Sequence, residues 1–294
     1  MPNARSSHIR PTTVGVGVVV PILVFLSTAM LLHEVLWPLV LALLIAAVGF
    51  IDDLREIPPH VRLLLQTILS ATSIAFVAPN RPLVILAGTL LVVAAINGLN
   101  FMDGINGITG TLGALLGLLL ASVGLYAMAW QWAAVGVTLT AACMGYLPHN
   151  FPRPRSFPGD VLPYFLAATF IPGIIDIATV TPVALLSAGA LAPSALDTGG
   201  TIIRRIRTGE SLITPHRDHA YQRLARRTSH ATSTMCFFAM AALCSTGTAV
   251  GMSTSFATGL ACTGGAVLVT ALCISFIPLD EGPSATSLVN GAAH

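Results

Sequence analysis

Long apolar runs dominate this chain of 294 residues, and their length decides what it can fold into. Hydrophobic residues make up 54% of the sequence and charged residues only 9%, whereas a typical soluble domain carries roughly 25% charged residues. A helix needs about 20 residues to cross the hydrocarbon core of a bilayer. The sequence therefore predicts an integral membrane protein that is surrounded by the lipid bilayer and has no nucleic-acid partner.

The apolar runs form about ten segments that short polar stretches separate. Helices are expected because backbone polar groups in lipid must be bonded within their own segment, and no alternating barrel pattern is visible. The expected segments are 14–33, 35–51, 62–80, 83–96, 107–128, 131–148, 161–176, 180–196, 235–252 and 255–278. The prediction is an all-α polytopic bundle forming a single domain over residues 1–294, with 279–294 as a disordered tail.

Two local patterns refine this prediction. Gly110, Gly113 and Gly117 recur at small-residue spacing in the fifth segment, which predicts close packing against a neighbouring helix. The seventh and eighth segments contain prolines, which are expected to interrupt both helices. These prolines are Pro163, Pro172, Pro182 and Pro193.

The basic residues are distributed unevenly between the two sides of the expected membrane. All 14 of them are arginine. If residues 52–62 are placed on one side and the crossings are counted along the chain, every arginine except Arg81 falls on that side. Such a bias follows the positive-inside rule, so this side is expected to be cytoplasmic. We therefore expect a multi-pass protein of the cell inner (plasma) membrane.

The acidic residues Asp52-Asp53, Asp103 and Asp160 lie at the ends of apolar runs, and two expected spans separate each successive site. An even number of crossings returns the chain to the side it left, so the four carboxylates are predicted to share the cytoplasmic face. Ion ligands of a transporter are expected near mid-span, which argues against that class. The pattern indicates a metal-dependent site for an anionic substrate at the lipid boundary.

Amide side chains near these acids favour a divalent cation. Residues 97–107 place Asn97, Asn100 and Asp103 on a glycine-rich turn between two apolar runs. Carboxylate and amide oxygens are the ligands that Mg²⁺ prefers, and Asp160 follows a glycine where such a cation could bridge to a phosphate. Taken singly, the acids and amides are also explained by a solvated helix end, an ordinary interhelical turn and a positively charged loop, and these alternatives stay open.

Histidine and arginine follow the eighth segment, at His216, Arg217 and His219. Beside a magnesium site such residues suit a diphosphate, although a solvated basic helix is the alternative. Together the polar groups predict phosphoryl-group chemistry, in which Mg²⁺ neutralises a diphosphate and a carboxylate activates the nucleophile. Mn²⁺ is the alternative cation. The sequence contains no G-x-x-x-x-G-K-[ST] loop, so P-loop ATP hydrolysis is not supported.

These motifs resemble those of the polyprenyl-phosphate N-acetylhexosamine-1-phosphate transferase family, over nearly the whole chain. Asp52-Asp53 with Arg62 looks like the Asp-Asp motif of the family. Residues 97–107 are similar to its N-x-x-N-x-x-D-G-x-D-G motif, with Asn106 in place of the second aspartate. Residues 150–160 resemble its loop ending in F-x-G-D.

The later part of the chain carries two further points of resemblance. Residues 197–205 are similar to the stretch that precedes the last catalytic loop of the family. Residues 216–224 look more like the O-antigen and capsule initiating branch than the triple-histidine loop of phospho-MurNAc-pentapeptide transferase. This branch favours a UDP-N-acetylhexosamine donor.

The resemblance implies an enzyme that transfers a sugar 1-phosphate from a UDP-sugar to undecaprenyl phosphate. UMP is released, and the lipid product serves cell-envelope synthesis of lipopolysaccharide or cell wall. The resemblance implies that Asp52 or Asp53 activates the lipid phosphate, and that Asp160 with Asp103 or Asn100 binds Mg²⁺. The implied substrate-binding residues are Asn97, Asn150, Arg62, His216, Arg217 and His219.

The chain departs from the family pattern in two places. Val161-Leu162-Pro163 replaces the usual x-Gly-Ser after Gly-Asp, and Met1 falls at a loop that normally follows a first transmembrane helix. We therefore expect either a misassigned start or one helix fewer. A catalytically impaired relative that binds polyprenyl phosphate or an assembly partner is the alternative function, and whether the chain forms a homodimer stays open.

Overall fold

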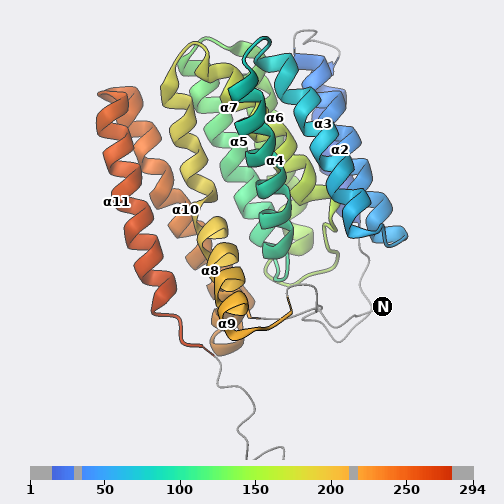
Figure 1. Cartoon of the computed structure of the whole chain (residues 1–294), viewed down its shortest axis with the longest axis vertical. Helices are drawn as coiled ribbons and strands as arrows, with labels where there is room; N and C mark the ends of the chain where they lie inside the picture. Colours follow the sequence, from blue (N-terminus) through green and yellow to red (C-terminus); the bar gives the residue numbers. More distant parts are fainter. Residues whose placement is uncertain (1–14, 30–34, 212–217, 280–294) are drawn as a thin grey trace, which may run out of the picture.

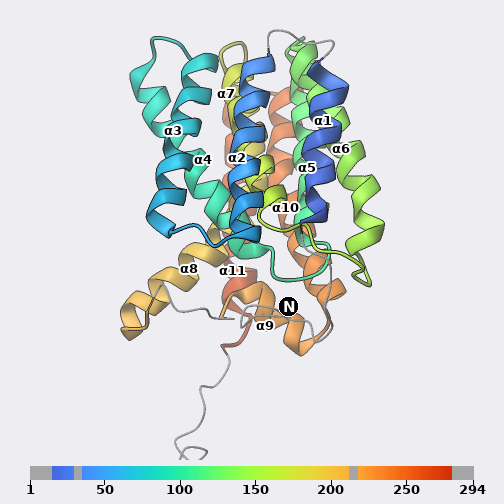
Figure 2. The same cartoon turned by 90° about the vertical axis from the view of Figure 1, so that its right-hand side faces the viewer.

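The computed structural model describes residues 15–29, 35–211 and 218–279. Within these ranges the chain is a bundle of helices lying side by side, with no strand (Figures 1 and 2), which confirms the predicted all-α class. The elements are η1 (Val16–Val18), α1 (Val19–Ala29), α2 (Leu36–Leu54), α3 (Pro59–Val77), α4 (Pro82–Met102), α5 (Ile108–Tyr126), α6 (Trp130–Asn150), α7 (Val161–Ala178), η3 (Pro182–Leu191), α8 (Ala192–Thr208), α9 (Ala220–Arg227), α10 (His230–Ser253) and α11 (Phe256–Ser275). The expected tail lies almost entirely outside the described residues.

The predicted count of about ten membrane-spanning helices is not confirmed. Within the described ranges, 7 helices are long and apolar enough to cross a bilayer: α2, α3, α4, α5, α7, α10 and α11. The remaining expected segments correspond to α1, to α6 and to the pair formed by η3 and α8. Of the first segment, the structure describes an α-helix of only 11 residues. The eighth is divided into a 3-10 helix and the start of α8, so neither part is a long apolar helix.

The predicted effect of the prolines is right for the eighth segment and wrong for the seventh. Pro182 and Pro193 stand at the starts of η3 and α8, where the segment divides. In contrast, α7 continues through Pro163 and Pro172. Pro163 lies in the first turn, where a backbone N–H has no partner within the helix, so its loss is tolerated.

The central helix of the bundle is α7, whose residues are almost all buried. It packs against α2, α4 and α5, which explains why its sequence is apolar on every side rather than amphipathic. At its C-terminal end the indole Nε1–H of Trp132 in α6 donates a hydrogen bond of 2.6 Å to the carboxylate of Asp176. The core helix is therefore anchored to a neighbour at the end opposite Asp160.

The close packing predicted for the fifth segment is confirmed between α5 and α6. A Cβ placed on Gly117 of α5 would lie 2.7 Å from the backbone N of Thr140 in α6. A Cβ on Gly136 of α6 would lie 2.3 Å from the backbone N of Ala121 in α5. Both distances are too short for a side chain, so these helices can approach this closely only where glycine faces the partner.

Substituting two glycines of α6 tests this contact. Gly136→Ala should lower the unfolding temperature of the purified protein in detergent, because overpacking costs about 1–3 kcal/mol. Gly145→Ala is the matched control, since no atom of a neighbouring helix lies within 4 Å of its added Cβ. The control should be neutral or raise the unfolding temperature, because alanine has the higher helix propensity. Equal effects at the two positions would contradict the described packing.

Candidate functional site

Three helices that are distant in the sequence meet at the N-terminal end of α7. Asp160 precedes the first residue of this helix, and its backbone N–H donates a 3.0 Å hydrogen bond to Oδ2 of Asp53, near the end of α2. One carboxylate oxygen of Asp160 accepts a hydrogen bond of 3.2 Å from Nδ2 of Asn100, near the end of α4. The structure thus brings together Asp53, Asn100 and Asp160, which the sequence predicted as site residues.

Two glycines make this approach possible. Gly159 has a φ of +69°, and a Cβ on it would lie 2.1 Å from Oδ2 of Asp53. A Cβ on Gly49 of α2 would lie 2.8 Å from the carbonyl oxygen of Asp160. A side chain at either position would separate α2 from the start of α7, so glycine is required by both conformation and space.

The adjacent acids Asp52 and Asp53 have different surroundings. Asp52 accepts hydrogen bonds from the backbone N–H of Ile57 at 2.8 Å and from the guanidinium of Arg62 in α3. Its side chain is only 9% exposed, so both of its oxygens are engaged inside the protein. Asp53 is exposed, and its contact with the backbone of Asp160 leaves it open to solvent. The pair therefore offers one structural and one accessible carboxylate.

Asp103 follows α4 directly and lies on a turn that α9 contacts. Its Oδ1 accepts a hydrogen bond of 2.5 Å from the hydroxyl of Thr109. The hydroxyl of Tyr221 in α9 donates to the carbonyl oxygen of Phe101, two residues before Asp103, at 2.8 Å. These contacts fix the turn between α4 and α5 from both sides.

The carboxylates of Asp52, Asp53, Asp103 and Asp160, here called the carboxylate cluster, influence one another. Burial raises the pKa of Asp160, the charge of Asp52 raises it further, and Arg62 opposes the shift. Burial also raises the pKa of Asp103 well above its ordinary value; the Thr109 hydrogen bond opposes this, and the charges of Asp160 and Asp53 add to it. Gathered carboxylates in poorly hydrated surroundings are stabilised by protons or by a cation.

Two asparagines that the sequence predicted as substrate-binding are engaged in internal hydrogen bonds. Asn97 donates to Oε1 of Gln66 in α3 at 2.9 Å. Asn150 is buried, accepts from the backbone N–H of Gly107 at 2.6 Å and donates to the carbonyl oxygen of Ser156 at 2.8 Å. In this conformation, Asn97 joins two helices and Asn150 holds the loop before α7 in place.

The carboxylate cluster lies within a segment shared with known proteins. Residues 35–178 match the family model described as glycosyl transferase family 4. Over this segment, which is about half of the chain, the sequence is similar to this family. The match covers α2 to α7 and ends before α8, so it is narrower than the whole-chain resemblance expected from the motifs.

Three mycobacterial proteins are similar to this chain, and each is named decaprenyl-phosphate N-acetylglucosaminephosphotransferase. The protein of Mycolicibacterium smegmatis is 34% identical over 163 residues, which cover 48% of this chain and 40% of that protein. The protein of Mycobacterium leprae is 33% identical over 167 residues, covering 48% and 41%. That of Mycobacterium tuberculosis strain H37Rv is 32% identical over 163 residues, covering 48% and 40%. The chain thus matches less than half the length of these curated relatives.

Outside the segment that matches the family, Asp197 of α8 organises the start of α9. Its buried carboxylate accepts hydrogen bonds from the backbone N–H groups of Ala220 at 2.7 Å and Tyr221 at 3.1 Å. An acid at a helix N-terminus satisfies N–H groups that have no partner within the helix. The sequence placed Asp197 in a resembling stretch but not among the site residues, because nothing local shows which helix it caps.

This contact also places His219, the residue before α9. Its Nδ1 lies 3.6 Å from Oδ1 of Asp197, and its ring centroid is 6.1 Å from that of Phe101 near the end of α4. His219 therefore lies beside the same helix end that bears Asn100. Two other predicted residues, His216 and Arg217, lie outside the described residues.

Arg205 ties the end of α8 to the stretch leading into α9. Its Nη1 donates to Oδ2 of Asp218 at 2.5 Å, and its Nη2 donates to the carbonyl oxygen of Ser211 at 2.5 Å. The side chain of Arg205 is buried, and its positive charge is balanced by Asp218 and Glu210. This arginine therefore has a structural role.

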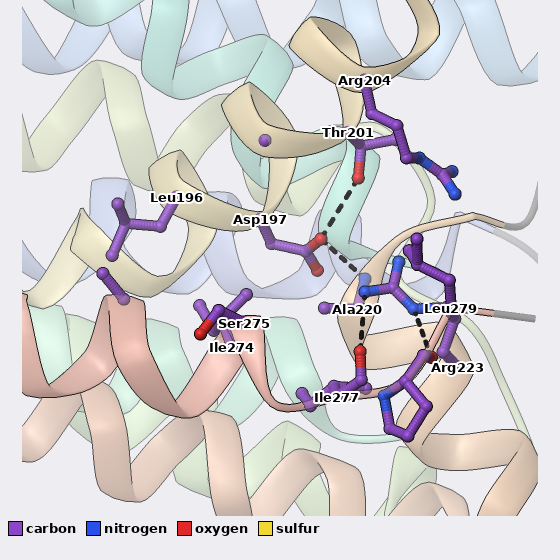
Figure 3. A pocket seen from close by; sticks show the side chains of 13 residues that line it. Leu196, Asp197, Thr201, Arg204, Ala220, Arg223, Ile274, Ser275, Ile277 and Leu279 are labelled. Carbon is purple, nitrogen blue, oxygen red and sulfur yellow. Dashed lines mark hydrogen bonds between the residues drawn. The ribbon is translucent and has the colours of Figure 1, made fainter. Parts of the chain in front are cut away.

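A pocket of about 390 Å³ lies between α8, α9, α11 and the segment after α11 (Figure 3). Leu196 and Ile274 contribute apolar surface, and Arg204 lies at its edge. Arg223 also lines the pocket, but its Nε donates to the carbonyl oxygen of Pro278 at 3.1 Å. The lining comes from a part of the chain outside the family match, and none of its residues belongs to the carboxylate cluster.

The residues at the start of α7 have the donor chemistry for Mg²⁺, although they do not form a complete ligand cage. Within the described ranges, no three His, Cys, Asp or Glu side chains are arranged as a metal-binding group. Mg²⁺ is usually held by one or two carboxylates, with substrate phosphates and water completing its coordination. Asp160, Asp103 and the amide of Asn100 fit this mode of binding.

The role of Asp197 can be tested by its removal. Asp197→Ala should lower the unfolding temperature in detergent, because the buried N–H groups of Ala220 and Tyr221 lose their acceptor, at a cost of about 1–3 kcal/mol. Glu210→Ala is the control, since this acid is 45% exposed and an exposed ion pair contributes about 0–1 kcal/mol. An equal or larger loss of stability in the Glu210 variant would contradict the capping role.

Proposed function

We propose that this chain transfers an N-acetylhexosamine 1-phosphate from a UDP-sugar to undecaprenyl phosphate, releasing UMP, at the cytoplasmic face of the inner membrane. The observation that carries the proposal is the meeting of Asp53, Asn100 and Asp160 at one end of an apolar bundle, inside the family segment. The names of the relatives, which specify a polyprenyl phosphate and N-acetylglucosamine, support the classes of acceptor and sugar. The product would enter cell-envelope polysaccharide synthesis.

In the proposed reaction an oxygen of the acceptor phosphate attacks the β-phosphorus of the donor. A new P–O bond forms, and the bond from that phosphorus to the bridging oxygen breaks, so that this oxygen leaves on UMP. Asp53 is suited to accept a proton from the acceptor phosphate because it is exposed and close to Asp160. Asp52 instead holds Arg62, which adds positive charge beside the site.

A divalent cation, when bound, would neutralise the diphosphate of the donor as its charge develops. We assign Asp160 and Asn100, with Asp103 close by, to Mg²⁺ or Mn²⁺. The repulsion within the carboxylate cluster supports this assignment, because it is relieved when a cation binds. We assign the stretch 216–219 to the diphosphate of the donor, and His219 lies beside α4 as this role requires.

The alternative of an impaired relative rests on the altered segment after Asp160. In the structure Val161 begins α7 and Pro163 lies in its first turn. Asp160 nevertheless contacts both Asp53 and Asn100. This arrangement favours a working enzyme over an impaired one.

An assay of the purified full-length protein tests the proposal. Given undecaprenyl phosphate, Mg²⁺ and a panel of UDP-N-acetylhexosamines, the protein should release UMP with at least one donor. EDTA should reduce the rate to background, and Mg²⁺ or Mn²⁺ should restore it, because the diphosphate then regains its counter-charge. Decaprenyl phosphate, tested in parallel, reports on the choice of acceptor. A folded protein that releases no UMP with any donor would contradict the proposed function.

The division of roles within the acid pair is tested by two isosteric variants. Asp53→Asn should lower kcat by about 10²–10⁴-fold, the usual contribution of a positioned base, with little change in unfolding temperature. Asp52→Asn should lower the unfolding temperature, because Arg62 loses its charged partner, and should affect kcat less. Steady-state kinetics and thermal unfolding of both variants provide the comparison. The reverse order of the kcat losses would assign the base to Asp52.

A further inference from the structure

Tyr164 is a buried polar residue that neither the motifs nor the proposed mechanism uses. It lies in α7, four residues after Asp160, and is 0% exposed. Residues four apart lie on the same face of a helix. A Cβ on Gly49 of α2 would lie 3.1 Å from Cδ2 of Tyr164, so the tyrosine ring packs against the glycine that also makes room for Asp160.

The hydroxyl of Tyr164 is buried and lies near charged groups. It makes no hydrogen bond of normal geometry with the described part of the chain. It does lie within electrostatic range of Asp160, Arg62 and Asp52. A buried hydroxyl without a partner destabilises the protein, and rotation about its C–O bond lets it reach different nearby acceptors.

Of the charged groups near Tyr164, only some can accept a hydrogen bond from its hydroxyl. Arg62 carries only donors, so it cannot accept a hydrogen bond. Asp52 already receives the N–H of Ile57 and the guanidinium of Arg62 on its two oxygens. The side chain of Asp160 is held by Asn100 through a bond of 3.2 Å, which is long for a charged acceptor. Asp160 is therefore the acceptor that gains most from an additional donor.

The segment between Asp160 and Tyr164, which departs from the family pattern, offers no other side-chain donor. Val161, Leu162 and Pro163 have no side-chain donor. Tyr164 is therefore the first residue of α7 whose side chain can hydrogen-bond to the residue at the start of the helix. The Tyr164 hydroxyl and the Asp160 carboxylate are near enough to interact as donor and acceptor.

We propose that Tyr164 is a positioning residue, whose hydroxyl donates a hydrogen bond to the carboxylate of Asp160 and fixes its orientation toward the cation. This inference rests on the proposed function, because it assigns to Tyr164 the orientation of a residue proposed to bind Mg²⁺. Groups that orient a metal ligand change metal affinity or activity by roughly 10–100-fold when they are removed. Tyr164 acts through Asp160 and does not itself contact the substrate.

Tyr164→Phe tests the proposal, because it removes the hydroxyl and keeps the ring that packs on Gly49. The Mg²⁺ concentration that gives half-maximal UMP release should rise by roughly 10-fold or more. The KM for the UDP-sugar at saturating Mg²⁺ should stay close to that of the wild type. Tyr126→Phe is the matched control, since this tyrosine is 49% exposed at the C-terminal end of α5 and should leave both values unchanged.

A second measurement does not depend on turnover. Mg²⁺ alone should raise the unfolding temperature of the wild type, and Tyr164→Phe should need roughly 10-fold more Mg²⁺ for the same rise. In metal-free buffer, Tyr164→Phe should lower the unfolding temperature when Asp160 is present and have no such effect in an Asp160→Ala background, because coupled residues are not additive.

The outcomes separate the inference from the function on which it rests. An active wild type with an unchanged Mg²⁺ requirement in Tyr164→Phe would overturn the inference and leave the proposed function standing. An inactive wild type would overturn the proposed function, and the unfolding measurements would then decide whether Tyr164 orients Asp160. Equal effects of Tyr164→Phe in the wild-type and Asp160→Ala backgrounds would exclude the hydrogen bond.

Discussion

The hydrogen bond from the backbone N–H of Asp160 to the carboxylate of Asp53 is the contact on which the arrangement of the site depends. It joins the end of α2 to the start of α7, and it exists only because Gly49 and Gly159 carry no side chain. The N-terminus of a helix carries a partial positive charge, which stabilises the anionic form of an acid placed there. The fold therefore offsets part of the repulsion that arises when several carboxylates are brought together.

An acid of one helix caps the N-terminus of another helix at a second place in the structure, with a different result. Asp197 of α8 accepts the first N–H groups of α9, as Asp53 accepts the N–H at the start of α7. The first contact assembles the acids, and the second positions His219 next to the end of α4. In both parts of the candidate site, an acid of one helix thus caps the N-terminus of another and holds the two helices together. The difference is that Asp53 stays exposed, whereas Asp197 is buried and structural.

The sequence allowed the meeting of the acids to be predicted, because pairs of apolar runs return the chain to the same side whatever their exact bounds. It did not allow the number of long helices to be predicted, since apolar composition does not show where η3 ends and α8 begins. It also failed for Asp197, whose partners lie 23 and 24 residues away. The surroundings of Tyr164 depend on Gly49 of another helix, a relation that no local pattern contains.

The burial of α7 over its whole length has a mechanical consequence. One end of this helix contacts Asp53 and Asn100, and the other is held by the indole of Trp132 on Asp176. A fully packed helix of this kind holds Asp160 in a fixed position, since it cannot slide or tilt without repacking its neighbours. If the proposed lipid acceptor requires the site to widen, we expect the movement in the helices around α7 rather than in α7 itself. We therefore expect substitutions near Asp176 to change the position of Asp160, because α7 transmits a displacement from one of its ends to the other.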